Sequence, residues 1–413
     1  MRFTQNQLKE AVHAGNAEAD IFKSYLGYIT IRDLPDAIFG PSLLEPPSKD
    51  LLNNKFITRE YLVNIFGIEK KIKTLAFQEQ DKTVSACSTT ALWSAFHKTS
   101  ELFKTPVPSP SEITKSAGNI FTSHGRAFPS KGLDFFQICN SIENFGLVSE
   151  MRNKESFFED DVVVRGFIYS YLKFGLPVLL AIKIDGLRGG HHLITLTGYS
   201  KTKAIPLTYE RVSLESEKVG ECYSHDDQVG PYSRIKFLSK GKITTFWPKA
   251  DGKGYRNATC LGLIVPIHPK VRLNFEIILA EINKVYSVLG ILVRRPELWI
   301  FDIYLELSNN YKENLLSPAE TSSLTEQIVF DCLPKYIWVA AAHLSDELKF
   351  EFIFDATDVI KGFHLLHWRF VKSQTKSQIR SKLKESVIQE LIKMHLGEIY
   401  LEFFLESVGI KYG

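Results

Sequence analysis

The chain has 413 residues, of which 44% are hydrophobic and 23% are charged. This composition can bury a substantial core and argues against extended disorder. The formal net charge of +3 is small for this length, so we expect no nucleic-acid partner and no attraction to an acidic membrane surface. Two domains are the default expectation for a chain this long.

The cysteines are odd in number and no two are closely spaced: Cys87, Cys139, Cys222, Cys260 and Cys332. This pattern argues against a disulfide framework or a zinc site, and we predict no metal ion and no cofactor. The N-terminal residues lack the apolar core of a signal peptide, and no run of about 18 apolar residues predicts a membrane span. A reducing cytoplasm fits this pattern and would keep the thiols free.

The first part of the chain predicts an N-terminal extension followed by helices. Residues 1–55 are polar and irregular, with three prolines between Gly40 and Asp50. From about residue 56 the hydrophobic spacing tightens and leads to a strand at 72–77. Apolar periodicity, capping residues and glycine stops predict four helices: 87–96, one beginning after Ser109, 132–144 and 162–174.

The pattern then changes from helical to extended. A continuous apolar run at 178–184 is typical of a buried strand. Helices followed by a mostly antiparallel sheet give an α+β layout for a domain spanning 56–267. The polar stretch 201–220 is interpreted as an insertion between two strands, and 246–257 as a long loop. Further strands are predicted at 192–199, 221–225, 232–237 and 261–267.

A boundary is expected at the proline-flanked segment 266–269, followed by a C-terminal α+β domain at 268–413. The lysines and arginine at the start of its last helix are interpreted as a solvated face. We expect this domain to recognise a partner or to restrain the active site. Its predicted elements are a helix at 275–289, strands at 298–307, 336–342 and 350–354, and a helix from about 375 to 405.

Cys87 is the candidate nucleophile, in the run QDKTVSACSTTALW at 80–93. A cysteine attacks as its thiolate, yet a free thiol is only slightly ionised at neutral pH. The N-terminus of a helix stabilises the anion through its unpaired N–H groups and its dipole, and a neighbouring histidine does the same as an ion pair. Cys87 opens an apolar helix and so has the first of these two features.

His192 is the candidate base. It is the first residue of the strand predicted at 192–199 and is followed by the apolar pair Leu193-Ile194. The strand would hold an imidazole rigidly. The preceding Gly189-Gly190 leaves room for the backbone of a substrate. His191 is the alternative, and because neighbouring side chains of a strand face opposite sides, only one of the two histidines can serve.

Two further groups would complete the constellation. Asp226 or Asp227 lies at the end of a strand predicted to run beside the histidine strand, where a carboxylate can accept a hydrogen bond from the second ring nitrogen. Gln80 could donate its side-chain amide to an oxyanion together with the backbone N–H of Cys87, and Gln78 is the alternative.

The order of these motifs resembles papain-like cysteine peptidases, in particular the bacterial double-glycine type that processes bacteriocin leaders. The resemblance lies in Gln80 ahead of Cys87, in His192 six residues before Gly198-Tyr199, and in an acidic strand end. The run GLPVLL at 175–180 also matches the strand that such enzymes place before the histidine. The likeness covers about residues 70–238, and at most reaches 267.

The chain departs from that family at two motifs. Cys87 is followed by Ser88, where papain and the leader peptidases have other residues, and the Asp-Pro of the leader peptidases is replaced by Asp226-Asp227. Both changes bear on substrate preference more than on fold. No transporter segments are present, so the resemblance implies no role in export.

The resemblance implies a papain-like core with a triad of Cys87, His192 and Asp226 and an oxyanion hole assisted by Gln80. We therefore predict a cysteine peptidase that hydrolyses a peptide or isopeptide bond of a peptide or protein substrate. The alternatives are an acyl-transfer enzyme of the same fold (transglutaminase, deamidase or acetyltransferase type) and an inactive fold that binds a protein. Residues predicted to contact the substrate are Trp93, Gly190, His191 and Asp227.

Overall fold

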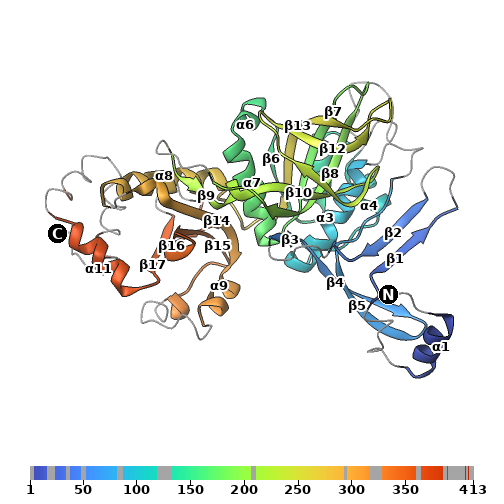
Figure 1. Ribbon diagram of the computed structural model, residues 1–413, viewed down its shortest axis with the longest axis horizontal. Coiled ribbons are helices and arrows are strands. Elements are labelled where there is room, and N and C mark those ends of the chain that lie inside the picture. The colour runs from blue at the N-terminus through green and yellow to red at the C-terminus, as the bar shows by residue number, and fades with distance from the viewer. Residues whose placement is uncertain are drawn as a thin grey trace. The chain divides into compact units, whose positions relative to one another are not determined.

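The computed structural model shows an α+β protein, as the sequence predicted, with helices and predominantly antiparallel sheets (Figure 1). Its contacts divide the chain into two compact units. The first comprises Met1–Asp160, Gly175–Lys201 and Gly220–His268, and the second comprises Asp161–Phe174, Thr202–Val219 and Pro269–Gly413. The structure describes residues 4–15, 24–33, 38–47, 53–80, 87–118, 132–205, 211–292, 295–316, 328–359, 364–384, 388, 405 and 408.

An eight-stranded sheet forms the centre of the first unit, in the order β11-β10-β8-β7-β13-β12, with β3 beside β8 and β6 beside β13. The buried apolar strand β7 pairs antiparallel with both β8 and β13. A bridge between Phe237 and Ile243 joins the strands at the two ends of this order, so the sheet curls around. The strands are β3 (Asn54–Phe56), β6 (Val148–Arg152), β7 (Val178–Ile184), β8 (His191–Lys201), β10 (Val219–Asp226), β11 (Gly230–Lys236), β12 (Lys242–Pro248) and β13 (Tyr255–Ile267).

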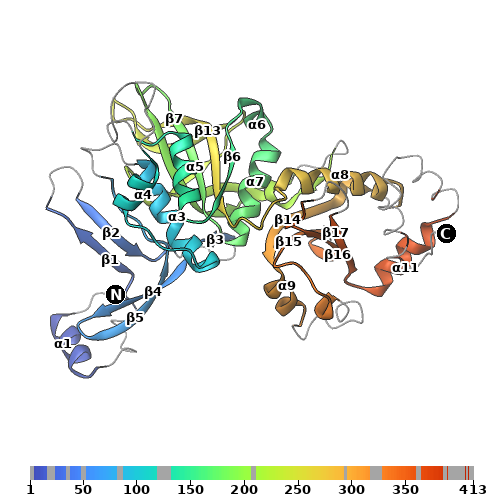
Figure 2. The ribbon, with the colours of Figure 1, turned by 180° about the vertical axis from the view of Figure 1, so that it is seen from behind.

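Helices gather on one side of this sheet, as Figure 2 shows for the helices at Cys87–Phe103, Pro110–Ser116 and Phe135–Asn144. Local signals set their ends: Ser109 and Asp134 are N-caps in capping boxes, and Gly146 follows one helix with a positive φ of 80°. Thr195 Oγ1 of β8 donates a hydrogen bond of 2.9 Å to the carbonyl of Ala91, which ties the central sheet to the first of these helices. The helices are α3 (Cys87–Phe103), α4 (Pro110–Ser116), α5 (Phe135–Asn144) and α6 (Glu155–Glu159).

Gly198, part of the motif that follows His192, has a packing role in the sheet. It pairs with Phe56 where β3 adds to β8. A Cβ atom at this position would lie 2.5 Å from the carbonyl oxygen of Lys55, which real contacts do not allow. Glycine therefore permits the close approach of β3, and the N-terminal part of the chain is built into the sheet that carries the histidine.

The N-terminal region, predicted as an irregular extension, instead contains regular elements. One two-stranded hairpin, β1–β2, lies within residues 1–55. A second hairpin, β4–β5, lies in the predicted 56–267 domain, and its last strand ends at Thr74, so it covers only the start of the strand predicted at 72–77. A capping box of Thr4 and Gln7 begins the first helix, whose Ala11 packs on Ile68. These elements are α1 (Gln5–His13), β1 (Gly27–Ile31), β2 (Phe39–Leu44), β4 (Arg59–Ile65) and β5 (Ile68–Thr74).

The second unit is built on a five-stranded sheet in the order β17-β16-β15-β14-β9. Aromatic side chains fill its core; Trp338, Phe350 and Phe352 are fully buried. Its elements are α7 (Asp161–Phe174), β9 (Ser213–Leu214), η1 (Glu215–Lys218), α8 (Phe275–Leu292), η2 (Pro296–Leu298), β14 (Trp299–Leu307), α9 (Ser308–Leu315), β15 (Tyr336–Leu344), β16 (Glu347–Asp355), β17 (Leu365–Phe370) and α11 (Ser373–Lys382).

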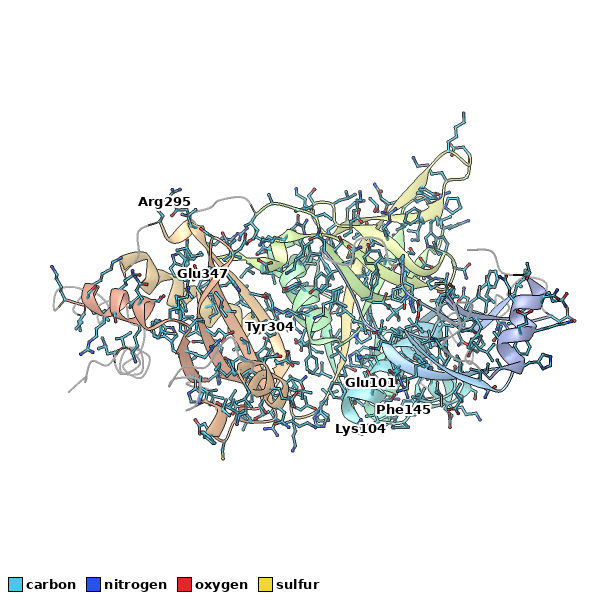
Figure 3. The ribbon with its side chains drawn as sticks, turned by 60° about the horizontal axis from the view of Figure 1, so that its bottom comes forward. Glu101, Lys104, Phe145, Arg295, Tyr304 and Glu347 are labelled. Carbon is cyan, nitrogen blue, oxygen red and sulfur yellow. The ribbon has the colours of Figure 1, made fainter. Side chains whose placement is uncertain are left out.

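Buried charges within the second unit are paired. The Glu351 carboxylate accepts hydrogen bonds from Tyr311 Oη at 2.6 Å and from Arg369 Nε at 2.7 Å. Lys173 Nζ lies 3.6 Å from the ring centroid of Tyr304, a β14 residue labelled in Figure 3, and 2.5 Å from a carboxylate oxygen of Asp302. These charges are satisfied internally, as buried charges must be.

One unit boundary falls at His268 and Pro269, within the expected segment 266–269, but two earlier segments group with the C-terminal unit. Helix α7 groups with the C-terminal elements because its buried face packs there: Tyr169 Oη donates to Asp302 at 3.0 Å, and the Tyr171 ring lies edge-on to Trp338. The expected insertion at 201–220 also groups there, since its strand β9 pairs in parallel with β14. Periodicity located these segments but carried no information on which core they join.

Two further expectations need correction. The long loop predicted at 246–257 is a loop only at 249–254, because β12 extends to Pro248 and pairs with β13, which begins at Tyr255. The last helix begins at Ser373, but much of the span predicted to 405 lies outside the described residues. In the described part of the chain, no helix has both the length and the apolar character to cross a membrane.

Candidate active site

A buried histidine–carboxylate pair lies where β8 and β10 run side by side. His192 Nε2 is 2.9 Å from Asp226 Oδ1, and both side chains are almost completely buried. His192 is the second residue of β8, and Asp226 is the last residue of β10, its neighbour in the sheet. Adjacent strands thus bring together residues that are 34 positions apart in the sequence.

The second oxygen of Asp226 is also held. Trp247 Nε1 donates a hydrogen bond of 3.0 Å to Oδ2, and the backbone N–H of Gln228 donates one of 3.0 Å to Oδ1. The Trp247 ring lies edge-on to the His192 ring, with centroids 5.1 Å apart. Three donors therefore fix the orientation of this carboxylate.

The electrostatics of the pair favour the charged form of both groups. Burial by itself lowers the pKa of His192, but the hydrogen bond and charge of Asp226, with further contributions from Cys87 and Asp227, raise that pKa well above its usual value. Burial also works against the Asp226 carboxylate, yet the charge and hydrogen bond of His192 together with the other donors lower its pKa. The site is built to hold an imidazolium beside a carboxylate.

Cys87 meets the same imidazole. It is the first residue of α3, is half-buried, and lies close enough to His192 that its side chain helps to raise the pKa of the imidazole. Nε2 of the His192 ring faces the two carboxylates. A helix N-terminus and an imidazolium are the two features that favour a thiolate.

A second carboxylate, Asp227, also reaches the histidine. Its Oδ1 lies 3.2 Å from His192 Nε2. Burial raises the pKa of Asp227 to about 6, with the charge of Asp226 adding to the effect against that of His192. Asp227 also borders a small cavity of about 10 Å³ that Gln78 and His225 help to line. Asp226 and Asp227 were alternatives in the sequence; the structure places both on the imidazole, with the shorter distance to Asp226.

The nitrogen of His192 and the oxygens of Asp226 and Asp227 lie within 4.8 Å of one another, close enough to be considered as metal ligands. The donor arrangement suits a different role. Both oxygens of Asp226 already accept N–H bonds from Trp247 and Gln228, and His192 presents the same Nε2 to both carboxylates. Such a set stabilises a protonated imidazole.

The other three residues predicted to contact a substrate have the following environments. His191 is exposed, on the opposite side of the strand from its buried neighbour. A Cβ atom at Gly190 would lie 2.8 Å from Leu187 Cβ, so this glycine serves the tight turn before β8. Trp93 is buried in α3, with its ring 4.4 Å from that of His97.

The oxyanion candidates have different environments. Gln78 is buried beside the cavity that Asp227 borders, whereas Gln80 is half-buried and precedes residues 81–86, which lie outside the described residues. The assignment of Gln80 to the oxyanion hole therefore stays a prediction.

Trp247 is the residue that the sequence analysis missed, because it fell in a segment interpreted as a loop. The alternation in KITTFWP at 242–248 is interrupted by a bulge, which weakened the strand signal. A tryptophan following a short β-branched run is the one local feature that could have suggested an element there.

Neither the known protein-family models nor the curated protein sequences include a match to this chain.

Proposed function

We propose that this protein is a cysteine hydrolase of peptide or isopeptide bonds, with Cys87 as nucleophile, His192 as acid and base, and Asp226 as the group that orients the histidine. The observation that carries the proposal is the buried His192–Asp226 pair, with the Cys87 side chain close enough to the same imidazole to help raise its pKa. Buried groups with strongly shifted pKa values cluster at functional sites, which favours an enzyme over a binding protein.

The chemistry follows from the charges. The Cys87 thiolate adds to the carbonyl carbon, and the His192 imidazolium gives its proton to the departing amine, which leaves a thioester on Cys87. His192, now neutral, takes a proton from water, whose oxygen attacks the thioester and releases the acid and the thiol. Asp226 holds the ring in the tautomer with its proton on Nε2, so that Nδ1 exchanges the proton.

The arrangement of elements supports a papain-like layout for the first unit. Helix α3, which begins at the nucleophile, is tied through Ala91 to strand β8, which begins at the base. The neighbouring strand β10 ends at the carboxylate. This order of helix, histidine strand and acidic strand end is the one on which the resemblance to papain-like peptidases rests.

The decisive experiment is labelling with a peptide electrophile such as a peptidyl vinyl sulfone. The full-length chain should be modified at Cys87 and at no other cysteine, as mapped by mass spectrometry after proteolysis. His192→Ala should lower the labelling rate at least a hundredfold, whereas His191→Ala, which changes the exposed neighbour, should leave it within twofold. Equal labelling of all five cysteines would remove the basis of the proposal.

The bond that is cleaved is identified separately. The wild-type chain is incubated with a peptide library, with and without an added primary amine, and the products are analysed by mass spectrometry. Hydrolysed peptides that depend on Cys87 support a peptidase. Amine incorporation or deamidation without cleavage would instead assign the site to acyl transfer.

A further inference from the structure

The hairpin β1–β2 exposes a cluster of large apolar side chains. Six of them lie within or next to its two strands: Leu26, Tyr28, Ile29, Ile31, Ile38 and Phe39. Leu26 and Ile31 are 67% and 65% exposed. Isolated surface hydrophobics need no explanation, but such a concentration on one hairpin is typical of an interaction site.

Strand β1 is exposed on both faces and along one edge. The consecutive residues 28–31 are all exposed, and consecutive side chains of a strand point to opposite faces. β1 pairs only with β2 in a sheet of two strands, so its other edge faces no strand of the described chain. Neither strand carries a charged residue, GYITI and FGPSLL, so β1 lacks the charges that usually protect an edge from pairing.

The hairpin is joined directly to the segment that leads to the nucleophile. On the side away from β1, Ser42 of β2 exchanges two backbone hydrogen bonds with Phe77, of 2.7 and 3.1 Å. The backbone N–H of Glu79 donates to the carbonyl of Phe39 at 3.0 Å, and Arg32 Nη2 donates to the carbonyl of Glu79 at 3.0 Å. The segment 77–79 therefore lies beside β2 as an added strand, with β1 as the outer edge.

The same segment borders the candidate site. Phe77 and Gln78 line the small cavity with Asp227, and the Phe77 ring lies edge-on to His225 at 5.5 Å. Eight residues after Glu79 the chain reaches Cys87 at the start of α3. The exposed edge is thus continuous, through backbone pairing, with the residues around the imidazole, and Figures 1 and 2 both show the hairpin extending away from the sheet beside α3.

We propose that β1 is a substrate-binding exosite, which captures an extended, uncharged and apolar segment of the polypeptide substrate by adding it as a further strand. The proposal rests on the proposed function, because a site that hydrolyses peptide bonds beside the hairpin implies that the ligand of β1 is a polypeptide. Main-chain hydrogen bonds would supply affinity, and the apolar side chains on both faces of β1 would favour a segment of alternating β-branched residues.

The length of the strand favours a substrate over a second copy of the chain. β1 has five residues and is therefore roughly 17 Å long. A stable dimer buries about 1,200 Å² or more, which is well beyond what two such strands can cover. A short pairing of this kind suits a contact that forms and releases during turnover.

The test measures peptide binding apart from catalysis. The probe is a fluorescein-labelled ten-residue peptide of alternating isoleucine and threonine with a lysine at each end, and binding to full-length Cys87→Ser is followed by fluorescence anisotropy. A control peptide with proline at alternate positions cannot form the ladder. We expect the first peptide to bind and the proline peptide to bind at least tenfold more weakly; equal binding of the two would overturn strand addition.

Matched variants locate the surface. Ile29→Lys and Ile31→Lys place a charge on β1 and should each weaken binding at least tenfold in the Cys87→Ser background. Leu62→Lys makes the same change at a residue of the other hairpin that is 62% exposed, and it should leave binding within twofold. Loss of binding in all three variants, or in none, would contradict the assignment to β1.

Two further measurements separate this proposal from the proposed function and from self-association. The hydrolase is tested by labelling of the wild-type chain with the peptide electrophile, whereas the exosite is tested by peptide binding in the Cys87→Ser background, so a wild-type chain that fails to label argues against the hydrolase but not against the exosite. Light scattering should find the same mass for wild type and Ile31→Lys. A dimer that Ile31→Lys dissociates would show that β1 pairs with a second copy and would overturn the proposal.

Discussion

Trp247 Nε1 donates a hydrogen bond of 3.0 Å to Asp226 Oδ2, and its ring lies edge-on to the imidazole that the same carboxylate holds. One side chain from β12 thus fixes the carboxylate and covers the histidine. Inside a protein such a bond is stronger than in water, and its loss leaves a buried acceptor oxygen without this partner.

Trp247→Phe should therefore weaken the site without removing any group of the proposed triad. A buried oxygen that loses its partner costs about 1–3 kcal/mol, so we expect labelling or cleavage to fall about 5- to 150-fold. The Trp247 bond helps to lower the pKa of Asp226, so its removal should move the acid limb of the rate profile to higher pH. Phe246→Leu, on the same strand, is the control; an unchanged acid limb in Trp247→Phe would contradict this role.

The two neighbouring aspartates should respond differently to the same substitution. Asp226→Asn removes the charge and the preferred acceptor of His192, and we expect a loss of at least about a hundredfold at all pH values. Because the pKa of Asp227 is about 6, Asp227→Asn should resemble the wild type at pH 5.

Above pH 6 the ionised Asp227 helps to raise the pKa of His192. Removing that charge lets the imidazolium lose its proton at lower pH, so the basic limb of the Asp227→Asn profile should shift downward. Rates of thiol alkylation from pH 4.5 to 9.5 check both variants. Loss of activity in Asp227→Asn that is equal at pH 5 and pH 8 would instead make it the essential carboxylate.

His225 predicts a stability that depends on pH. Burial lowers the pKa of this histidine to about 3 in the folded state, against an unperturbed value of 6.5. The unfolded chain therefore binds a proton that the folded chain does not, and stability is lost as the pH falls below 6.5 toward 3. At pH 4.5 this linkage amounts to about 2–3 kcal/mol.

His225→Phe should remove that loss, because phenylalanine keeps an aromatic ring beside Tyr232, whose ring centroid lies 4.8 Å away, and does not titrate. The free energy of unfolding is measured in urea at pH 7.5 and pH 4.5. Between these two pH values, we expect the wild type to lose more stability than His225→Phe. His191→Phe changes an exposed histidine and serves as the control. A stability difference between His225→Phe and wild type that is the same at both pH values would exclude the linkage.

A chain that ends near Pro269 should fail to fold. It would keep α7 but lose the residues on which that helix packs in the second unit, among them Asp302 and Trp338. Strand β9 would lose its partner β14 as well. We expect aggregation, or a circular dichroism spectrum with reduced helix and strand content. A soluble chain with full reactivity at Cys87 would show that these packing contacts are dispensable.

Local patterns in the sequence were sufficient for the parts of the fold that depend on neighbouring residues. The strand at Val178–Ile184 was predicted at its observed bounds, because a continuous apolar run between glycine and turn residues has few other solutions. The cap at Ser109 and the start of α3 at Cys87 were equally local. The same local signals identified Cys87 and His192 as the pair to examine.

Only the tertiary structure decided which distant segments meet. The sequence could not place both Asp226 and Asp227 on one imidazole, because the bulge that ends β10 determines where the two carboxylates point. Nor could it show that Trp247 covers the site, that α7 packs with the C-terminal sheet, or that β1 keeps an exposed edge. Periodicity reports that a face is apolar but not which surface covers it, since burial depends on contacts between residues far apart in the chain.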